Sequence, residues 1–418
     1  MTHETKIVRD PIHGDISINT IFNSILETPE IQWLYNIKQL GLAHLVFPGA
    51  HHSRLEHSLG TYHLAHQAAS QLHLDPSEQQ LIAIAALLHD IGHGPFSHTL
   101  ESILLEKFGV DHIDLTELLI SGKTTIFTDN EQEIIPTIPV YELLINEGIS
   151  QKDIIAIIRG SYTKAPYLSQ LLSSTIDVDQ LDYLIRDAHY TGVAYGLIDI
   201  QRFLQTLCIN NNHLAISRKG VSVVENILMA RGLMYTSVYF HKTVRIAELM
   251  LSKACELLDD PDPFLLFRMT DAEIMQHLRH ADTYQNEIVT RLKYRRLFKQ
   301  AYALHISEAT EQEKDLIQKM EDAEFRHEKE RDLADKLAIP EGHIIIDVPR
   351  PELLRTEPRI NQTGIIVIDH DMQKSLDVFT PIAQAVRERL TPDWSLMIIT
   401  DERYRERVAK KAPLLVTQ

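Results

Sequence analysis

The chain is poor in cysteine and in positive charge. It has 2 cysteines, Cys208 and Cys255, in 418 residues. So few cysteines exclude a disulfide scaffold and fit a reducing compartment. Its 41 Lys and Arg are outnumbered by 58 Asp and Glu, and the net charge is −17 at pH 7. This charge argues against broad electrostatic binding to nucleic acid or to an anionic membrane, although a local basic pocket for a small phosphorylated molecule stays compatible with it.

Long apolar runs are also missing from the sequence. No segment approaches the ~20 apolar residues that a membrane-spanning helix needs. The polar start, Met1–Lys6, lacks the pattern of a signal peptide. We therefore expect a cytoplasmic protein without a membrane partner. A hydrophobic content of 44% is ordinary for a globular protein, and the length allows two or three domains.

Helical periodicity dominates residues 1–260, which we expect to form the catalytic core. Residues 21–117 and 141–188 show helical spacing that is broken at glycine and proline, and residues 223–258 predict one long helix. Short hairpins are predicted at residues 6–18 and 209–222.

The rest of the chain differs in composition. Residues 261–340 are charged and predicted to be helical. Residues 341–418 predict a small α/β unit, with a helix at 376–390 and with strands at 343–348, 364–368 and 395–400. The expected fold is therefore mainly α, with an all-helical core, short β-hairpins and a small C-terminal α/β unit.

The segment Ala86–His98 carries the strongest chemical signal. An apolar helix ends there in His89 and Asp90, and His93 and His98 follow within nine residues. Packing alone gives no reason for these polar groups. Neutral imidazole together with carboxylate suits a borderline divalent cation. The segment therefore predicts a metal site with hydrolytic chemistry.

Two other segments supply further candidate ligands. His57 lies in Ser53–Gly60 and Asp179 lies in Asp177–Asp187. Taken alone, each segment is compatible with a structural histidine or a solvated acidic helix. Taken together with His89 and Asp90, they form a two-His, two-carboxylate set. Such a set leaves coordination positions open for water and substrate.

The spacing within Asp177–Asp187 separates two helix faces. Asp179, Tyr183 and Asp187 recur every four residues and so share one face. Asp182 and Arg186 share another face, and we expect them to pair.

Six motifs together resemble those of the HD-domain phosphohydrolases, and within them the dGTPase-like branch of deoxynucleoside triphosphate triphosphohydrolases. The motifs are Asp10–Gly14, Ile37–Gly41, Val46–Ala50, Arg54–Gly60, His89–His98 and Asp177–Asp187. The motifs Asp10–Gly14 and Val46–Ala50 are more specific to this branch than the four separated His and Asp residues, which mark only the broad superfamily. The resemblance covers roughly the first 190 residues well and implies an HD-type helical fold.

The resemblance also implies the reaction and its catalytic groups. Water would attack the α-phosphorus and release deoxynucleoside and intact inorganic triphosphate. The metal would be held by His57, His89, Asp90 and Asp179, and these residue types admit Mn, Fe, Zn, Ni or Mg. His112 matches the catalytic histidine, His93 a further histidine near the α-phosphate, and Glu101 a carboxylate that orients a catalytic histidine. A histidine of near-neutral pKa can protonate the leaving 5′-oxygen.

The same resemblance implies a set of substrate contacts. The matching residues are Gln39 and Asp187 at the sugar 3′-hydroxyl, Tyr183 beside the sugar, Leu40 and Tyr239 at the 2′ position, and Arg54 and Arg231 at the phosphates. For Arg231, an exposed helix charge is the alternative interpretation.

The chain departs from the family pattern at Gln180, at Phe240, which stands where the animal enzyme has a polar residue in the base pocket, and at Trp33 and Tyr35. Gln180 stands where many relatives have Lys or Arg, which favours another phosphate ester, such as a nucleoside monophosphate, as the second candidate substrate. Trp33 and Tyr35 replace Arg residues of a second nucleotide site that lies between subunits in the animal enzyme. A nucleotide-sensing regulatory protein with weak turnover is the third possibility.

Four basic residues match that second nucleotide site: Lys6, Arg202, Lys219 and Lys242. They imply a homo-oligomer, a dimer or a tetramer, with nucleotide bound between subunits. The alternative is that they are unrelated surface charges.

Overall fold

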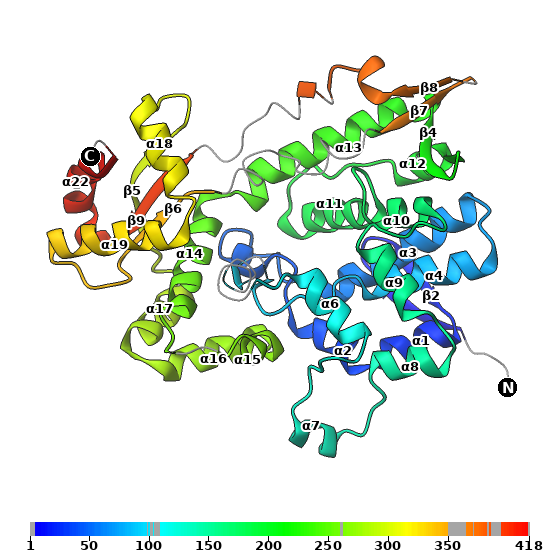
Figure 1. The fold of residues 1–418 in the computed structure, drawn as a ribbon, viewed down its shortest axis with the longest axis horizontal. Helices are drawn as coiled ribbons and strands as arrows, with labels where there is room; N and C mark the ends of the chain where they lie inside the picture. The colour runs from blue at the N-terminus through cyan, green and yellow to red at the C-terminus, as the bar shows by residue number, and fades with distance from the viewer. Residues whose placement is uncertain are drawn as a thin grey trace.

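The computed structural model describes residues 5–97, 99–100, 103, 109–259, 262–349, 365–370, 372–382, 384–385 and 394–416. Its helices form two lobes (Figure 1). The N-terminal lobe comprises residues 5–241 together with a hairpin at 366–375, and the C-terminal lobe comprises the other described residues after 241. The mainly α fold expected from the sequence is confirmed.

The N-terminal lobe is built from short and medium helices. They are α1 (Thr20–Leu26), α2 (Pro29–Trp33), α3 (Arg54–Gln71), α4 (Pro76–Leu88), α6 (His112–Ile120), α7 (Asp129–Ile134), α8 (Val140–Asn146), α9 (Gln151–Ile158), α10 (Pro166–Leu172), α11 (Val178–Thr191), α12 (Ile200–Thr206) and α13 (Val221–Met234). Short 3-10 turns η1 (Leu34–Asn36), η2 (Gly41–Leu45) and η3 (Arg218–Gly220) connect some of them.

Local caps fix where the site-bearing helices begin. Ser53 and Glu56 form a capping box at the start of α3, in which the Ser53 hydroxyl accepts the Glu56 N–H and the Glu56 carboxylate accepts the Ser53 N–H. Asp75 caps α4, and Asp177 caps α11. These caps place the first turn of each helix at a defined point of the chain.

Both predicted hairpins are confirmed. β1 (Lys6–Asp10) pairs antiparallel with β2 (Gly14–Ile18), and β3 (Leu207–Asn210) pairs antiparallel with β4 (His213–Ser217). Asn211 and Asn212 connect β3 and β4 with φ values of 49° and 64°. A two-residue type I′ turn requires positive φ at both positions, and asparagine tolerates it.

The C-terminal lobe combines helices with a three-stranded antiparallel sheet of order β5-β9-β6. The strands are β5 (Lys299–Leu304), β6 (Ile344–Asp347) and β9 (Leu396–Thr400). The helices are α14 (Lys242–Glu256), α15 (Pro263–Arg268), α16 (Asp271–Ala281), α17 (Thr283–Lys293), α18 (Glu311–Lys319), α19 (Ala323–Leu337) and α22 (Arg405–Val416). Strand β5 was missed by the sequence analysis, because it lies inside a segment whose charges predicted helix throughout.

Strand pairing crosses the predicted domain boundaries at residues 261 and 341. β7 (Ile366–Asp369) pairs with β8 (Met372–Ser375), and it also pairs in parallel with β4 of the N-terminal lobe. The last 78 residues therefore supply strands to two sheets. In the segment 376–390, where a helix was predicted, residues 376–378 form a 3-10 turn and residues 382 and 384–385 are helical. Residues 383 and 386–390 lie outside the described residues.

The single long helix predicted over residues 223–258 is wrong. α13 ends at Met234, a π-helical turn follows over Tyr235–Tyr239, and α14 begins at Lys242. His241 takes an extended conformation and accepts the Thr243 N–H, so that it caps the new helix. Residues 126–139, which lie between the two predicted helical regions 21–117 and 141–188, contain the short helix α7, which Thr128 and Glu131 cap.

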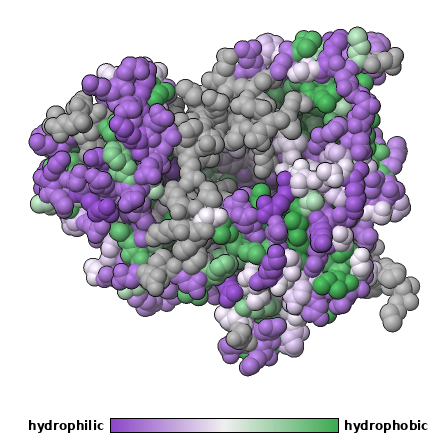
Figure 2. Space-filling model, viewed as in Figure 1, coloured by the Kyte–Doolittle hydropathy of each residue, from purple (hydrophilic) through white to green (hydrophobic). Residues whose placement is uncertain are grey.

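Three hydrophobic clusters fill the described part of the molecule. One fills the N-terminal lobe and includes Val367 of the C-terminal hairpin. A second joins α14–α17 to Leu42 and Phe96 of the N-terminal lobe. The third lies beneath α18, α19 and α22, whose visible outer surface is mostly hydrophilic (Figure 2). Among the described helices, none combines the length and apolar character needed to cross a bilayer.

A buried carboxyl makes the stability of this fold depend on pH. Glu30 is 1% exposed and accepts the Val140 N–H at 3.2 Å. Burial outweighs its backbone hydrogen bonds and raises the pKa of Glu30 from 4.5 to about 7. Between these values the folded state holds a proton that the unfolded state has released. The free energy of unfolding therefore falls as the pH rises through this window.

We predict that Glu30→Gln flattens this dependence and makes the protein more stable than the wild type at pH 8, by up to about 3 kcal/mol. Denaturant unfolding at pH 5 and pH 8 measures the effect. Glu27→Gln, at an exposed position of the same segment, is the control. An unchanged pH dependence in Glu30→Gln would contradict the assignment.

Candidate metal centre and substrate cavity

Three candidate ligands meet where α3 and α4 pack together. His57 lies in the first turn of α3, and His89 and Asp90 follow the end of α4. Ligand atoms of the three residues all lie within 4.8 Å of one another. The His89 Nε2 atom is 3.2 Å from Asp90 Oδ1, and the His57 Nε2 atom is 3.8 Å from Asp90 Oδ2.

Asp179 brings the fourth candidate ligand from the first turn of α11. Its Oδ1 atom lies 3.1 Å from His57 Nε2 and 3.7 Å from His89 Nε2. The structure thus brings together the four residues that the sequence separates over more than a hundred positions.

The orientation of both imidazoles fits a metal ion. The His57 Nδ1–H donates to Asp182 Oδ2 at 2.8 Å, and the His89 Nδ1–H donates to the Ala86 carbonyl at 2.8 Å. Both Nε2 atoms are therefore directed at the shared centre, where each can bind a metal ion in its neutral form. The His89 Nε2 atom is buried there and makes no hydrogen bond of good geometry within the described part of the chain. We conclude that these residues fit a divalent cation.

The electrostatics of the cluster lead to the same conclusion. Burial disfavours the charged form of His57, but hydrogen bonds with Asp179 and Asp182 outweigh burial and raise its pKa to about 10. Burial opposes the charged form of Asp90 as well, yet His89 and Arg54 hold its pKa well below the usual range. Ionised carboxylates in a buried site favour a bound cation.

Asp182 forms a network behind His57 that the sequence analysis anticipated only in part. The predicted pair with Arg186 is confirmed at 2.8 Å. Asp182 also accepts from His13 Nε2 at 2.7 Å, and Arg186 Nη1 donates to Asp10 at 2.8 Å. The motif Asp10–Gly14 therefore helps to fix Asp182, which in turn orients the candidate ligand His57.

Gly60 permits this network. A Cβ atom at position 60 would lie 1.8 Å from Asp182 Oδ1. Only glycine lets α3 and α11 approach closely enough for Asp182 to reach His57. This is the role of the last residue of Arg54–Gly60, which the sequence did not reveal.

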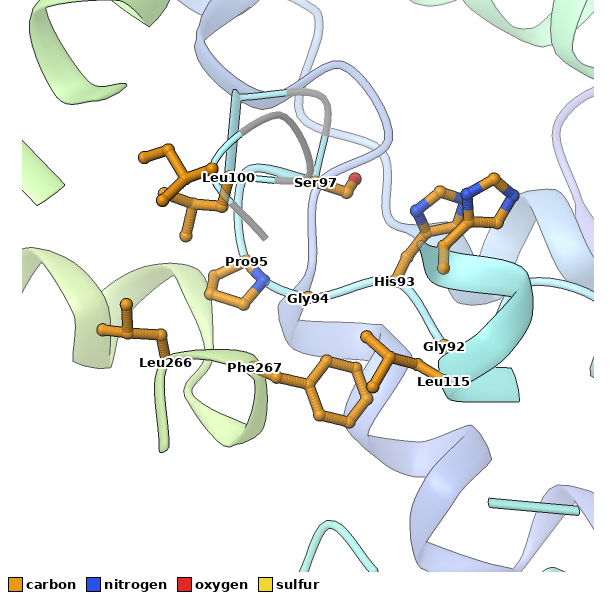
Figure 3. Close-up of a pocket in the computed structure, with 11 residues that line it drawn as sticks. Gly92, His93, Gly94, Pro95, Ser97, Leu100, Leu115, Leu266 and Phe267 are labelled. Carbon is orange, nitrogen blue, oxygen red and sulfur yellow. The ribbon is translucent and has the colours of Figure 1, made fainter. Parts of the chain in front are cut away.

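His93 and His112 stand next to the metal ligands. Their rings stack with centroids 4.1 Å apart and an angle of 11°, and His93 Nε2 lies 3.4 Å from Asp90 Oδ1. Burial, supported by Arg54 and His112, lowers the pKa of His93 to about 3. Figure 3 shows His93 on the segment Gly92–Ser97. The predicted residue Glu101 lies outside the described residues.

A second close approach brings His112 to this position. α6 begins at His112, where Asp111 and Asp114 form a capping box. A Cβ atom at Gly92 would lie 2.0 Å from the His112 carbonyl oxygen. Glycine at position 92 therefore lets the start of α6 pack against the segment that follows His89 and Asp90.

The two predicted phosphate contacts are buried arginines. Arg54 donates from Nη1 to Asp90 at 2.6 Å and from Nε and Nη2 to Ser97 Oγ at 3.0 and 2.5 Å. Arg231 is 3% exposed and donates to Gln180 Oε1 at 2.7 Å. The alternative of an exposed helix charge at Arg231 is therefore wrong. That both residues contact phosphate stays a prediction.

A cavity of about 1450 Å³ opens in front of the metal cluster. The five residues predicted to surround the sugar all line it: Gln39, Leu40, Tyr183, Asp187 and Tyr239. Its far side is formed by α14, α19 and β6 of the C-terminal lobe. The volume is ample for a nucleotide.

Two hydrogen bonds fix Asp187 in this cavity. His52 Nε2 lies 2.7 Å from Asp187 Oδ1, and the Tyr239 hydroxyl donates to Asp187 Oδ2 at 2.7 Å. The π-helical turn carries Tyr239, whose ring meets that of Tyr183 edge to face at 6.0 Å. π-Helical turns are rare and occur often at functional sites. The sequence analysis predicted Tyr239 as a residue beside the sugar, but it did not predict the π-helical turn that positions this side chain.

Residues 54–187 match the HD domain, and residues 198–416 match the HD associated region. The chain belongs to the HD-domain family. The resemblance to HD-domain phosphohydrolases is confirmed, and His57, His89 and Asp90 all lie within the residues that match the HD domain.

Relatives of this HD-domain protein occur in archaea, bacteria and animals. An uncharacterized protein of Methanocaldococcus jannaschii is 31% identical over 94% of this chain and 78% of its own length. The deoxynucleoside triphosphate triphosphohydrolase SAMHD1 of Gallus gallus is 31% identical over 61% of this chain, and the match spans 45% of that enzyme. A phosphohydrolase structure from Bacteroides thetaiotaomicron has a TM-score of 0.70 at 27% identity, covering 95% of this chain and 100% of that one.

The basic residues predicted to bind a second nucleotide are dispersed along the HD-domain protein. Arg202 on α12 donates to the carbonyl of Lys219, so these two are neighbours. Lys6 lies on β1, and Lys242 begins α14, which Figure 1 shows apart from α12. Nucleotide binding between subunits and the oligomeric state stay predictions.

We predict that His89→Ala and Asp179→Ala each abolish metal binding, because each removes one of four converging ligand groups. Mn²⁺ bound per chain, measured at equilibrium with the fold monitored by circular dichroism, tests this. His66→Ala, at an exposed histidine of α3, is the matched control. Full occupancy in both variants would remove these residues from the coordination sphere.

Proposed function

We propose that this protein hydrolyses deoxynucleoside triphosphates to deoxynucleoside and inorganic triphosphate with a divalent metal ion. The observation that carries the proposal is the shared cavity. The His and Asp cluster opens onto the same cavity as Asp187, Tyr239 and Gln39, the residues expected around a deoxyribose. The similarity to the triphosphohydrolase of Gallus gallus supports this substrate class.

The reaction divides between the metal and the chain. A divalent cation supplies Lewis acidity that neutralises charge on a phosphoryl group. Arg54 adds a fixed positive charge beside Asp90, and His93 Nε2 lies 3.4 Å from Asp90 Oδ1. His112 stacks on His93 and lines the cavity, where it is positioned to protonate the leaving 5′-oxygen.

The sugar would lie between Leu40 and Tyr239. Leu40 is 8% exposed, and the Tyr239 ring is fixed through its hydrogen bond to Asp187. Rigid side chains on both sides leave little freedom to accommodate an added hydroxyl. Asp187 is placed to accept a hydrogen bond from the 3′-hydroxyl.

Gln180 supports a second candidate, hydrolysis of a nucleoside monophosphate. Its side-chain oxygen accepts from Arg231, and its amide donates to the Ser174 carbonyl at 3.0 Å. A neutral residue therefore occupies the position where many relatives carry a cation for the phosphates. Fewer cations near the metal suit a substrate with fewer phosphates.

One product analysis distinguishes the two candidates. The four deoxynucleoside triphosphates and the four monophosphates are incubated with the protein and Mn²⁺, Mg²⁺, Zn²⁺, Ni²⁺ or Fe²⁺. Chromatography then identifies the products. Deoxynucleoside with intact triphosphate supports the proposal. Turnover of monophosphates alone would replace it with the second candidate, and turnover of neither would contradict both.

We predict that His112→Ala keeps the metal and loses turnover by roughly 10²- to 10⁴-fold, the contribution expected of a general acid. Mn²⁺ binding and kcat are measured on the same preparation. Unlike His89→Ala, this variant should bind metal as the wild type does. Activity near that of the wild type would show that His112 is an ordinary helix residue.

We predict a strong preference for deoxyribose over ribose, since a 2′-hydroxyl would meet Leu40 and Tyr239. Comparison of kcat/KM for dGTP and GTP measures the preference, and Leu40→Ala should reduce it by opening space on one side. Equal values of kcat/KM for the two nucleotides in the wild type would contradict this sugar gate.

A further inference from the structure

Asp271 is a buried carboxylate that does not cap its own helix. It is the first residue of α16, in the HD-associated region, and it is 5% exposed. The start of α16 is already capped by its neighbours, because Glu273 accepts the Thr270 N–H at 2.7 Å and Thr270 Oγ1 accepts the Glu273 N–H at 3.3 Å. A helix cap therefore does not explain why this carboxylate is buried.

Both oxygens of Asp271 instead accept backbone N–H groups of the N-terminal lobe. Oδ2 accepts from Lys38 at 3.0 Å, and Oδ1 accepts from Phe96 at 2.9 Å. The Lys38 ammonium group lies 3.6 Å from the same Oδ2. One carboxylate thus binds two segments that are far apart in the sequence.

The first of these segments lines the substrate cavity. Lys38 directly precedes Gln39 and Leu40, which face the cavity. The other edge of this segment is bonded to the start of α3. The Gln39 N–H donates to the His52 carbonyl at 3.0 Å, and the Arg54 N–H donates to the Ile37 carbonyl at 2.8 Å. The Lys38 N–H donates to Asp271 instead, so that Asp271 holds the edge of the segment that is not bonded to the start of α3.

The second segment leads to a metal ligand. Phe96 has a φ of +44°, which is unfavourable for a residue with a bulky side chain. Such a conformation persists only where the surroundings enforce it. The next residue, Ser97, accepts two hydrogen bonds from Arg54, and Arg54 donates to Asp90. Three consecutive contacts thus connect Asp271 to Asp90.

Apolar packing beside Asp271 holds the same segment. Leu266 and Phe267 of α15 line a small pocket together with Gly94 and Pro95 (Figure 3). A Cβ atom at Gly94 would stand 3.4 Å from the Phe267 ring. Phe96 itself belongs to the hydrophobic cluster of the C-terminal lobe. The segment Gly92–Ser97 therefore contacts the HD-associated region at Gly94 and at Phe96.

We propose that Asp271 is a positioning residue through which the HD-associated region holds two cavity-lining segments of the N-terminal lobe in register with the metal ligands. The effect that this proposal assigns to Asp271 in catalysis rests on the proposed function. Asp271 contacts neither substrate nor metal ligand and acts through Lys38 and Phe96. Displacements of about 1 Å at a reacting centre can cost roughly 100-fold in rate.

Two variants of Asp271 test the proposal in a graded way. Asp271→Asn keeps one acceptor oxygen but turns an amide donor toward one of the two N–H groups. Asp271→Ala removes both acceptors. Glu273→Gln is the matched control, because it removes a charge from the same helix turn without touching the HD domain.

Three readouts are taken on the full chain: hydrogen exchange of peptides that contain residues 38 and 96, the Mn²⁺ dissociation constant by chelator competition, and kcat and KM for deoxynucleoside triphosphates. In Asp271→Ala we expect faster exchange in both peptides, a several-fold rise in the Mn²⁺ dissociation constant and a 10- to 100-fold loss of kcat with a smaller change of KM. Asp271→Asn should lose less, and Glu273→Gln should match the wild type.

Three results would overturn the proposal. They are protected peptides in Asp271→Ala, faster exchange with unchanged Mn²⁺ binding and kcat, or equal losses in Glu273→Gln. If the wild type hydrolyses no deoxynucleoside triphosphate, the proposed function fails. In that case exchange and Mn²⁺ binding alone decide whether Asp271 positions the segments.

Discussion

The hydrogen bonds that converge on Asp182 hold the catalytic half of this protein together. The carboxylate is 0% exposed and accepts from His13, His57 and Arg186. The β1–β2 turn, α3 and α11 therefore meet at one charged group. A buried carboxylate is unfavourable unless it is fully paired and hydrogen-bonded, so a shift of any of these three elements would leave charge uncompensated. This constraint also keeps the His57 ring in a fixed orientation, with Nε2 toward the metal centre.

The same arrangement determines the charge of the metal centre. Asp90 and Asp179 lie beside two imidazoles, and Arg54 is the cation paired directly with Asp90. Hydrogen bonds with Asp179 and Asp182 raise the pKa of His57 against the effect of burial. The cluster thus has a high affinity for positive charge, which a proton on His57 or a divalent cation can supply. A net charge of −17 over the chain adds a long-range preference for cations.

The C-terminal lobe lines the cavity, as the HD domain does. Residues of α14, α19 and β6 form its far side, and a buried ion pair between Lys253 and Glu330 joins α14 to α19 at 2.7 Å. Glu330 also accepts the Ile346 N–H of β6. The outer wall of the cavity is therefore fixed by polar contacts as well as by the hydrophobic cluster that includes Phe96. Because Phe96 belongs to the N-terminal lobe, this cluster makes the position of one lobe matter to the geometry of the other.

Sequence alone determined the mainly α fold, both N-terminal hairpins, the metal cluster and the pair between Asp182 and Arg186, because these follow from local spacing and from motifs. Spacing reports which side chains share a face of one element. It does not report which elements meet. The break at Tyr235–Tyr239, the strand β5 and the pairing of β4 with β7 needed the tertiary structure. So did the bonds from His13 to Asp182 and from Asp271 to Lys38 and Phe96, since packing alone brings together residues this far apart in the chain.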